Sequence, residues 1–395
     1  MKLLDGITVV DLTRVLSGPY STMLLADFGA DVIKIEAPES GDDSRNFAPF
    51  IGKESAYFMS INRGKKSVTL DLRKHEGQEL LKKMIIKADV IVENYRPGTM
   101  ERWNLGYEDL RTVNPKIIYA AVSGFGHSGP YSRKPAYDIV IQAMSGIMSL
   151  TGPEGGPSCR VGTSVGDIIP GLYTAFGIMM ALYHRNVSGK GQKVDVAMFD
   201  GLVAALENAI ARFQVEQRVP KPLGNRHPSV TPFDSFSAKD GLVVIGAGSQ
   251  RLWELLCKDV IAQPELASDP LFVNGENRTK NHKELKNILE AAFSKMTLSE
   301  LTSALEKTGI PHGPINSIDR VMEDPQLRAR DMFVEIEHPV AGKLKYAGIP
   351  VKLSRTPGSI QAPAPILGQH TYEVLQKFAG LTKEDIADLH QKGIV

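Results

Sequence analysis

Two segments of the chain, GADVIKIE at residues 29–36 and KADVIVEN at residues 87–94, share the pattern that decides the fold class. Each has an Ala-Asp pair, then a short β-branched run, then an acidic residue. Comparable runs, bounded by polar or turn residues, lie at 7–10, 68–70, 117–122 and 194–198. Between two of these runs, the apolar residues of 80–88 recur at helical spacing. Strands that alternate with amphipathic helices predict an α/β fold with a mostly parallel sheet.

The residue composition and the expected secondary structure change twice after this region. Helical patterns at 168–183 and 202–218 lead to VPKPLGNRHP at residues 219–228, a segment rich in Pro, Gly and basic residues that is typical of a linker. Beyond the linker, a strand pattern at 242–245 precedes short charged helices, one opened by a capping box at Thr297 and closed by Gly309. The β-rich runs return at about residue 331, and the chain ends in helical patterns at 371–378 and 383–392.

Composition excludes several classes of protein. The 395 residues include 46 Lys and Arg against 45 Asp and Glu, so no large field exists to attract nucleic acid or an anionic membrane. The two cysteines, Cys159 and Cys257, lie far apart and have no metal-ligand neighbours, which excludes a disulfide scaffold and a zinc module. We expect a soluble protein of a reducing compartment, either the cytoplasm or, after removal of a transit peptide, the mitochondrial matrix. The apolar stretch 168–184 is expected to be a buried helix rather than a membrane span.

Familiar catalytic and cofactor motifs are either absent or incomplete. GFGHSG at 124–129 has the spacing of a dinucleotide fingerprint, but a proline and polar residues follow it instead of a helix. GAGSQR at 246–251 has arginine in place of the third glycine and favours an ordinary strand-to-helix turn. H-E-x-x-H and G-x-x-x-x-G-K motifs do not occur, and none of the nine histidines lies near a G-x-S-x-G elbow. The sequence therefore predicts neither metal hydrolysis, nor serine acyl transfer, nor a P-loop nucleotidase.

One carboxylate stands out, within VGTSVGDIIPG at residues 161–171. Asp167 lies between glycines, next to a helix that is otherwise apolar. An aspartate at this position, with proline close behind, is typical of a helix N-cap. A carboxylate beside glycines at a helix start is also reachable by a substrate and has backbone N–H groups nearby. The residues alone leave both interpretations open.

Several blocks of sequence, in order along the chain, carry a family resemblance. They are LDGITVVDLTRVLSGP (4–19), GADVIKIE with GDDSR (29–36 and 41–45), VENYRPG (92–98), GIPHGPIN (309–316) and LGQHT (367–371). Together they closely resemble the class III CoA-transferases, the formyl-CoA and carnitine CoA-transferase (CaiB/BaiF) family. The resemblance implies a large Rossmann-like CoA-binding domain built from residues 1–218 and 331–395, and a small α/β domain at 219–330. It also implies that two chains interlock as a homodimer.

The resemblance also implies roles for individual residues. Asp167 matches the nucleophile of the family. The positions that match the family's CoA contacts are Leu16, Ser17, Leu70, Arg73, Asn94, Tyr95, Arg96 and Arg102. The expected substrate contacts are Tyr137, Asp138, Arg226 and His227. Without the resemblance, the arginines are typical of a solvated surface, Asn94 of a turn, and Asp138 of a cap at a helix start.

The implied activity is transfer of CoA from an acyl-CoA, such as succinyl-CoA, to a carboxylic acid such as a dicarboxylate. It proceeds through an aspartyl anhydride and an aspartyl-CoA thioester, with CoA as a substrate and no metal or prosthetic group. Ala37 replaces an arginine of formyl-CoA transferase, and GNRHP at 224–228 replaces its glycine-rich lid, so specificity for formate or oxalate is not assumed.

Two other functions stay open on the residues. Racemases of the family have a His-Asp pair where this chain has Tyr137 and Asp138, and tyrosine is a poor acid/base group near neutral pH. Transferase activity is therefore favoured over 2-methylacyl-CoA racemisation. A non-catalytic CoA-binding subunit of a larger complex is the third hypothesis.

Overall fold

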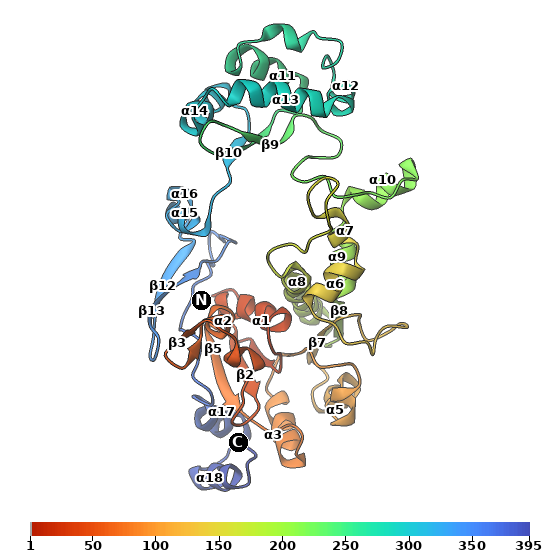
Figure 1. Ribbon diagram of the computed structural model, residues 1–395. Helices are drawn as coiled ribbons and strands as arrows, with labels where there is room; N and C mark the ends of the chain where they lie inside the picture. Colours follow the sequence, from red (N-terminus) through yellow and green to blue (C-terminus); the bar gives the residue numbers. More distant parts are fainter. Residues whose placement is uncertain (1) are drawn as a thin grey trace. The chain divides into compact units, whose positions relative to one another are not determined.

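The computed structural model describes residues 2–395 (Figure 1). Its internal contacts divide the chain into two compact units. Unit 1 consists of Met1–Met148, Arg160–Gln217 and Pro325–Val395. Unit 2 consists of Ser149–Cys159 and Arg218–Asp324. The short segment Ser149–Cys159 thus belongs to unit 2, although the segments before and after it in the chain belong to unit 1. Its sequence has no feature that predicts this.

Unit 1 is built on a six-stranded sheet in the order β5-β2-β1-β6-β7-β8. The strands are β1 (Thr8–Asp11), β2 (Asp31–Glu36), β5 (Lys65–Thr69), β6 (Val90–Glu93), β7 (Ile118–Ser123) and β8 (Lys193–Ala197). Every neighbouring pair is parallel. This confirms the predicted α/β fold with a mostly parallel sheet. The strand order reverses between β1 and β6, as in doubly wound Rossmann-like sheets.

Helices cover both faces of this sheet, because successive strand residues point to opposite sides. Val10 belongs to the core cluster that includes α3 (His75–Ile85), α5 (Tyr107–Val113) and α17 (Thr371–Ala379). Val9 belongs to the cluster that includes α1 (Ser17–Asp27) and α8 (Val165–Ser188). Burial on both faces explains why the strands read as continuous apolar runs rather than as alternating patterns.

The C-terminal segment joins the core formed by the N-terminal half. Val374 and Phe378 of α17 lie in the same apolar cluster as Ile33 of β2. Near the end of the chain, the carbonyl oxygen of Ile394 accepts a hydrogen bond of 2.8 Å from the amide of Asp71. Smaller elements of unit 1 are η1 (Asp43–Asn46), β3 (Phe50–Ile51), β4 (Glu54–Ser55), α2 (Ala56–Ile61), α4 (Thr99–Arg102), α6 (Asp138–Met144), α16 (Pro325–Ala329), β12 (Phe333–His338), β13 (Gly342–Ala347) and α18 (Lys383–Gln391). The short helix α7 (Ile147–Leu150) begins in unit 1 and ends in unit 2.

Two expectations about helices are wrong. Helix α8 is buried on one face only, whereas the opposite face exposes Phe176, Met180 and Tyr183. By length and composition it is the one helix of residues 2–395 that is apolar enough to cross a membrane.

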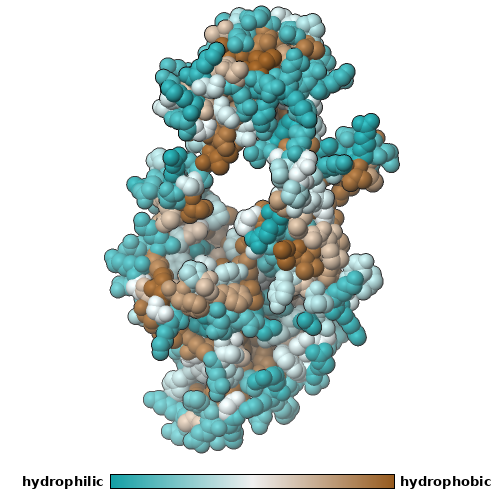
Figure 2. Space-filling model, viewed as in Figure 1, coloured by the Kyte–Doolittle hydropathy of each residue, from teal (hydrophilic) through white to brown (hydrophobic). Residues whose placement is uncertain are grey.

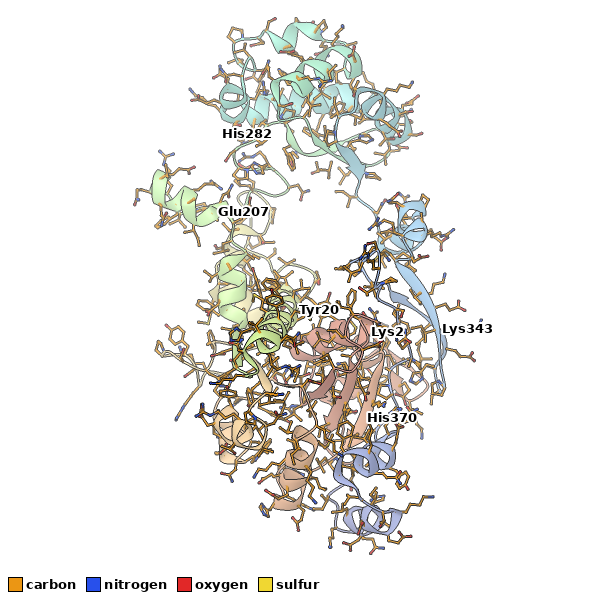
Figure 3. All side chains as sticks on the ribbon, turned by 180° about the vertical axis from the view of Figure 1, so that it is seen from behind. Lys2, Tyr20, Glu207, His282, Lys343 and His370 are labelled. Atoms are coloured by element: carbon orange, nitrogen blue, oxygen red, sulfur yellow. The ribbon has the colours of Figure 1, made fainter. Side chains whose placement is uncertain are left out.

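The single helix expected at 202–218 is two helices, α9 (Met198–Ala204) and α10 (Asn208–Glu216). Glu207, labelled in Figure 3, interrupts them with a φ of 53°.

Unit 2 has its own sheet and core. Strands β9 (Phe233–Ser237), β10 (Leu242–Gly246) and β11 (His312–Pro314) form an antiparallel sheet in the order β11-β10-β9. The helices are α11 (Gln250–Leu255), η2 (Leu256–Val260), η3 (Pro264–Ala267), α12 (Gly275–Lys280), α13 (His282–Phe293), α14 (Leu298–Thr308) and α15 (Ile318–Met322). The predicted capping box opens α14, and Gly309 closes it with a φ of 69°. The turn between β10 and α11 confirms the ordinary strand-to-helix interpretation of 246–251.

Candidate active site

A pocket of about 200 Å³ lies at the carboxyl ends of the parallel strands of unit 1. Its walls come from the segments after β1, β6 and β7, together with the start of α8. The lining residues that match the expected site are Leu16, Ser17, Asn94, Tyr95, Arg96, Tyr137 and Asp167. Because β1 and β6 lie where the strand order reverses, this is the place at which open α/β sheets bind their ligands.

A second pocket of about 450 Å³ lies over the ends of β2 and β5 and shares Arg14, Tyr95 and Arg96 with the first. Leu70 and Arg73 line this second pocket, but Arg102 lines neither. The Arg73 guanidinium is already paired with Asp71, through two hydrogen bonds of 2.9 Å. An approaching phosphate would therefore meet a guanidinium that is partly neutralised.

Asp167 is the third residue of α8, whose N-cap is Ser164. The N-cap interpretation of Asp167 is therefore wrong, because the helix begins three residues earlier than its apolar pattern indicates. The residues that follow Asp167 fix its position: Ile168 packs against the cluster that contains Leu16, and Ile169 against the cluster that contains Val122. The Asp167 carboxylate thus lies between the loop after β1 and the end of β7.

One turn further along α8, a glycine permits close approach of α1. A Cβ atom on Gly171 would lie 2.8 Å from the carbonyl oxygen of Ser17 and 3.2 Å from the ring of Tyr20. Tyr20 is labelled in Figure 3. Residues four apart share a helix face, so this contact lies on the same face as Asp167. A larger residue at position 171 would separate α8 from the start of α1.

The surroundings of Asp167 favour its neutral form. Burial raises the pKa of the Asp167 carboxyl to about 7, and the nearby charge of Asp138 adds to the effect. Within residues 2–395, no side chain or backbone group donates a hydrogen bond to this carboxylate. Near neutral pH, the molecules therefore divide between the neutral and the ionised carboxyl at this position.

Asp138 holds the first turn of α8. Its Oδ1 accepts hydrogen bonds of 2.8 Å from the amide of Gly166 and 2.9 Å from Nε2 of Gln142. Asp138 is the first residue of α6, whose N-cap is Tyr137, so the interpretation of Asp138 as a cap of its own helix is wrong. It does not line the first pocket, whereas Tyr137 does, with its side chain largely exposed.

Asn94 connects the loop after β6 to the loop after β1, at the point where the strand order of the sheet reverses. Its Oδ1 accepts a hydrogen bond from the Arg14 amide and its Nδ2 donates one to the Arg14 carbonyl oxygen, both at 2.8 Å. The side-chain amide therefore already has two partners in the backbone. Arg102 is exposed and donates to the Thr99 hydroxyl.

Two expected substrate contacts, Arg226 and His227, belong to unit 2. The His227 amide donates a 3.0 Å hydrogen bond to the carbonyl oxygen of Phe233, and its ring lies edge-on to the Phe233 ring. Asp167 belongs to unit 1, so a contact of these residues with the same substrate stays a prediction.

Sequence reasoning missed Tyr57, which lies in α2. Burial raises the pKa of the Tyr57 hydroxyl to about 12, with further contributions from the charges of Asp167, Asp42 and Asp138. Because the charge of Asp167 acts on the Tyr57 hydroxyl, the two side chains belong to one site. A tyrosine at the start of a short apolar helix gives no sign in the sequence that it belongs to a site.

A buried ion pair in the lining of the second pocket was also missed. Lys34 Nζ lies 2.8 Å from Asp42 Oδ2 and donates a 2.6 Å hydrogen bond to the carbonyl oxygen of Thr13. Burial alone would lower the pKa of Lys34, but the charges of Asp42 and Asp11 outweigh it and hold the pKa above its usual range. Asp42 Oδ1 accepts a 3.1 Å hydrogen bond from the amide of Val15, whose φ is 66°. The charged pair thus holds a strained loop just before Leu16.

Comparison with known proteins identifies similar chains. A model described as CoA-transferase family III matches residues 4–371. Acetyl-CoA:oxalate CoA-transferase of Acetobacter aceti is 43% identical over 377 residues, or 95% of each chain. Human succinyl-CoA:glutarate CoA-transferase is 38% identical over 396 residues, covering 100% of this chain and 90% of the human one. The crystal structure of a CAIB/BAIF family protein from Brucella suis matches with a TM-score of 0.84 and 36% identity, covering 95% of this chain and 99% of the other.

The fold and these matches define an enzyme of the CoA-transferase class. The chain belongs to CoA-transferase family III, which confirms the resemblance seen in the sequence. Its substrates are CoA thioesters and carboxylic acids. Among residues 2–395, no group of three or more His, Cys, Asp or Glu side chains is placed to hold a metal ion.

Proposed function

We propose that this enzyme transfers CoA from succinyl-CoA or a similar acyl-CoA to a dicarboxylic acid, with Asp167 as the covalent nucleophile. The observation that carries the proposal is the Asp167 carboxylate, which lines the pocket at the switch point and has no hydrogen-bond donor within residues 2–395. Its pKa of about 7 makes the ionised form available without an ion pair that would weaken it as a nucleophile.

The reaction balances as a series of acyl transfers. An oxygen of Asp167 attacks the thioester carbon, the C–S bond breaks, and CoA leaves as a thiolate. The thiolate attacks the Asp167 carbonyl, which releases the donor acid and leaves an aspartyl-CoA thioester. The acceptor carboxylate then displaces the thiolate to form a second anhydride, and the thiolate attacks the acceptor's carbonyl. This last step yields the new acyl-CoA and restores the Asp167 carboxylate, so no proton is consumed.

The choice of dicarboxylates rests on the named relatives and on one basic residue. The human relative is named for succinyl-CoA and glutarate, and the Acetobacter relative for oxalate. A guanidinium suits a distal carboxylate. Arg45 already donates two 2.7 Å hydrogen bonds to Glu36, whereas the buried Nε of Arg226 has no partner within residues 2–395. Arg45 is therefore committed to Glu36, and Arg226 stays the candidate for the distal carboxylate that the sequence suggests.

The test is intact-mass spectrometry after incubation with succinyl-CoA, with and without hydroxylamine or borohydride trapping, followed by peptide mapping. We expect a CoA-sized adduct, or its trapped derivative, on the peptide that contains Asp167. Absence of any adduct over a panel of acyl-CoAs, together with exchange of the α-proton in deuterated water, would contradict the proposal and support the racemase alternative.

The pH dependence of the reaction follows from the raised pKa of Asp167. Because only the ionised carboxylate attacks, kcat/KM is expected to rise up to about pH 7 and to level off above it. Asp138→Asn removes a neighbouring charge but keeps an oxygen for the Gly166 amide, so it should move the midpoint to lower pH. Asp200→Asn, on the exposed start of α9, is the control. A flat profile from about pH 5.5 to 8.5 would contradict this assignment.

We also propose that the enzyme is the interlocked homodimer that the family resemblance implies. The exposed face of α8 supports this, because Phe176, Met180, Tyr183 and Val187 recur at helical spacing and are 52–77% exposed. Figure 2 shows hydrophobic surface over the region of α6 and α8. Sedimentation should give one species of twice 43.1 kDa that does not dissociate on dilution. A monomer that appears at low concentration would contradict interlocking.

A further inference from the structure

Two buried serine hydroxyls line the pocket that contains Asp167 and have no hydrogen-bond partner within residues 2–395. Ser17 is 4% exposed and Ser123 is 7% exposed. Buried hydroxyls are nearly always bonded, and one left without a partner destabilises the fold. The neighbouring buried serine Ser21 follows the rule, since its hydroxyl donates a 2.7 Å hydrogen bond to the carbonyl oxygen of Gly18. We therefore expect a bound substrate to supply the hydrogen-bond acceptor for each of these two hydroxyls.

Ser17 is also the first residue of helix α1. The N-cap, Leu16, offers no side-chain acceptor to the first turn, and no acidic residue lies in that turn. The first N–H groups of a helix have no partner within the helix, and the macrodipole makes this end partially positive. An uncapped start of an 11-residue helix thus adds backbone donors beside the Ser17 hydroxyl.

The packing of α8 brings the start of this helix to the two segments that carry the serines. Ile168 packs against the cluster of Leu16, the residue before Ser17. Ile169 packs against the cluster of Val122, the residue before Ser123. The residues after Asp167 are therefore seated between the segments that carry the two hydroxyls, so donors approach the carboxylate region from the loop after β1 and from the end of β7.

We propose that Ser17 and Ser123, together with the first turn of α1, form an oxyanion subsite for the carbonyl groups that react at Asp167. This inference rests on the proposed function. Each attack turns a carbonyl into a tetrahedral centre, as the C=O electron pair moves onto the oxygen, and collapse of that centre returns the pair and expels the leaving group. Donors placed at this oxygen stabilise it only while it is charged, which accelerates the chemical step.

Neutral donors suit this position better than cations. A lysine or arginine beside Asp167 would form an ion pair with the carboxylate, lower its pKa and weaken it as a nucleophile. Serine hydroxyls stabilise the developing oxyanion without adding a charge. The raised pKa of Asp167 is consistent with surroundings that contain no adjacent cation.

The test uses Ser17→Ala, Ser123→Ala and the double variant, with Ser21→Ala as the matched control in the same helix. Single-turnover formation of the Asp167 adduct from succinyl-CoA, without an acceptor, isolates the chemical step. Each single alanine variant should slow it by about 10²-fold or more, and for Ser123→Ala, at a residue that is not an expected CoA contact, the Kd for free CoA should change by no more than about threefold. Ser123→Thr, which keeps the hydroxyl, should recover most of the rate.

A melting experiment separates this role from a structural one. Removal of a hydroxyl that has no partner should leave Tm unchanged or raise it, whereas Ser21→Ala should lower it slightly. Adduct formation at the parental rate in both alanine variants would overturn the inference and leave the proposed function intact. If the parental enzyme forms no adduct at Asp167, the proposed function fails and the inference fails with it.

Discussion

Replacement of Asp167 by alanine is expected to lower the rate of CoA transfer by roughly 10⁴-fold or more, because the variant has no carboxylate to accept the acyl group. The Kd for free CoA should change little, since the predicted CoA contacts lie mainly in the loops after β1, β5 and β6. Steady-state assays with succinyl-CoA and calorimetric titration with CoA measure the two quantities separately.

Asp200→Ala is the matched control for this variant. Asp200 is the third residue of α9, just as Asp167 is the third residue of α8, but it is exposed and lies outside the pocket. It should keep the parental rate. An Asp167→Ala enzyme that folds, binds CoA and still exchanges CoA at the parental rate would contradict the assignment of the nucleophile.

The raised pKa of Asp167 also predicts how the stability of the fold depends on pH. The folded state raises the pKa of Asp167 from its ordinary value of 3.8 to about 7, so the folded state disfavours the charged form. The resulting destabilisation is absent below about pH 4, grows as the pH rises, and is complete above about pH 7. Asp167→Asn should therefore raise Tm, and by more at pH 8 than at pH 5. A lower Tm at pH 8 would instead show that Asp167 is a structural element of the helix start.

Lys34→Met is the second change with a large expected effect, a loss of about 3–5 kcal/mol in the free energy of unfolding. The substitution leaves the carboxylate of Asp42 buried without its partner at 2.8 Å. It also removes the donor to the Thr13 carbonyl oxygen and the cation that holds Asp42, whose Oδ1 accepts the hydrogen bond from the Val15 amide. Denaturant unfolding at a fixed protein concentration, with the rate of CoA transfer, measures the effect.

Lys66→Met is the control on the neighbouring strand. Lys66 pairs with Asp31 and Glu373 at 3.3 and 3.2 Å, but its side chain is 30% exposed. Its loss should cost less than about 1 kcal/mol. The double variant Lys34→Met/Asp42→Asn should recover part of the stability, because no unpaired charge then remains. Equal losses for Lys34→Met and Lys66→Met would show that the buried pair does not hold the loop.

The strands of the large sheet could be predicted because local pattern is enough to recognise them. A β-branched run that is buried on both faces has few alternatives, and the runs around Val9, Ile33 and Ile91 all became parallel strands. Helix starts were less certain. The start of α8 was misplaced because Val165 and Gly166 carry no helix signal of their own, and the α6 residue Asp138 supplies the acceptor for the Gly166 amide.

What the sequence determined by itself is therefore the class of fold and the family, and it singled out Asp167 as a candidate, since periodicity, glycine spacing and ordered motifs are all local properties. Tertiary structure alone decided that Asp167 is an unpaired group with a raised pKa, that Lys34 and Asp42 support the loop beside it, and that two serine hydroxyls lie near it without partners. These properties depend on burial and on contacts between residues far apart in the chain. No pattern of neighbouring residues encodes the distance between β1, β7 and the first turn of α8.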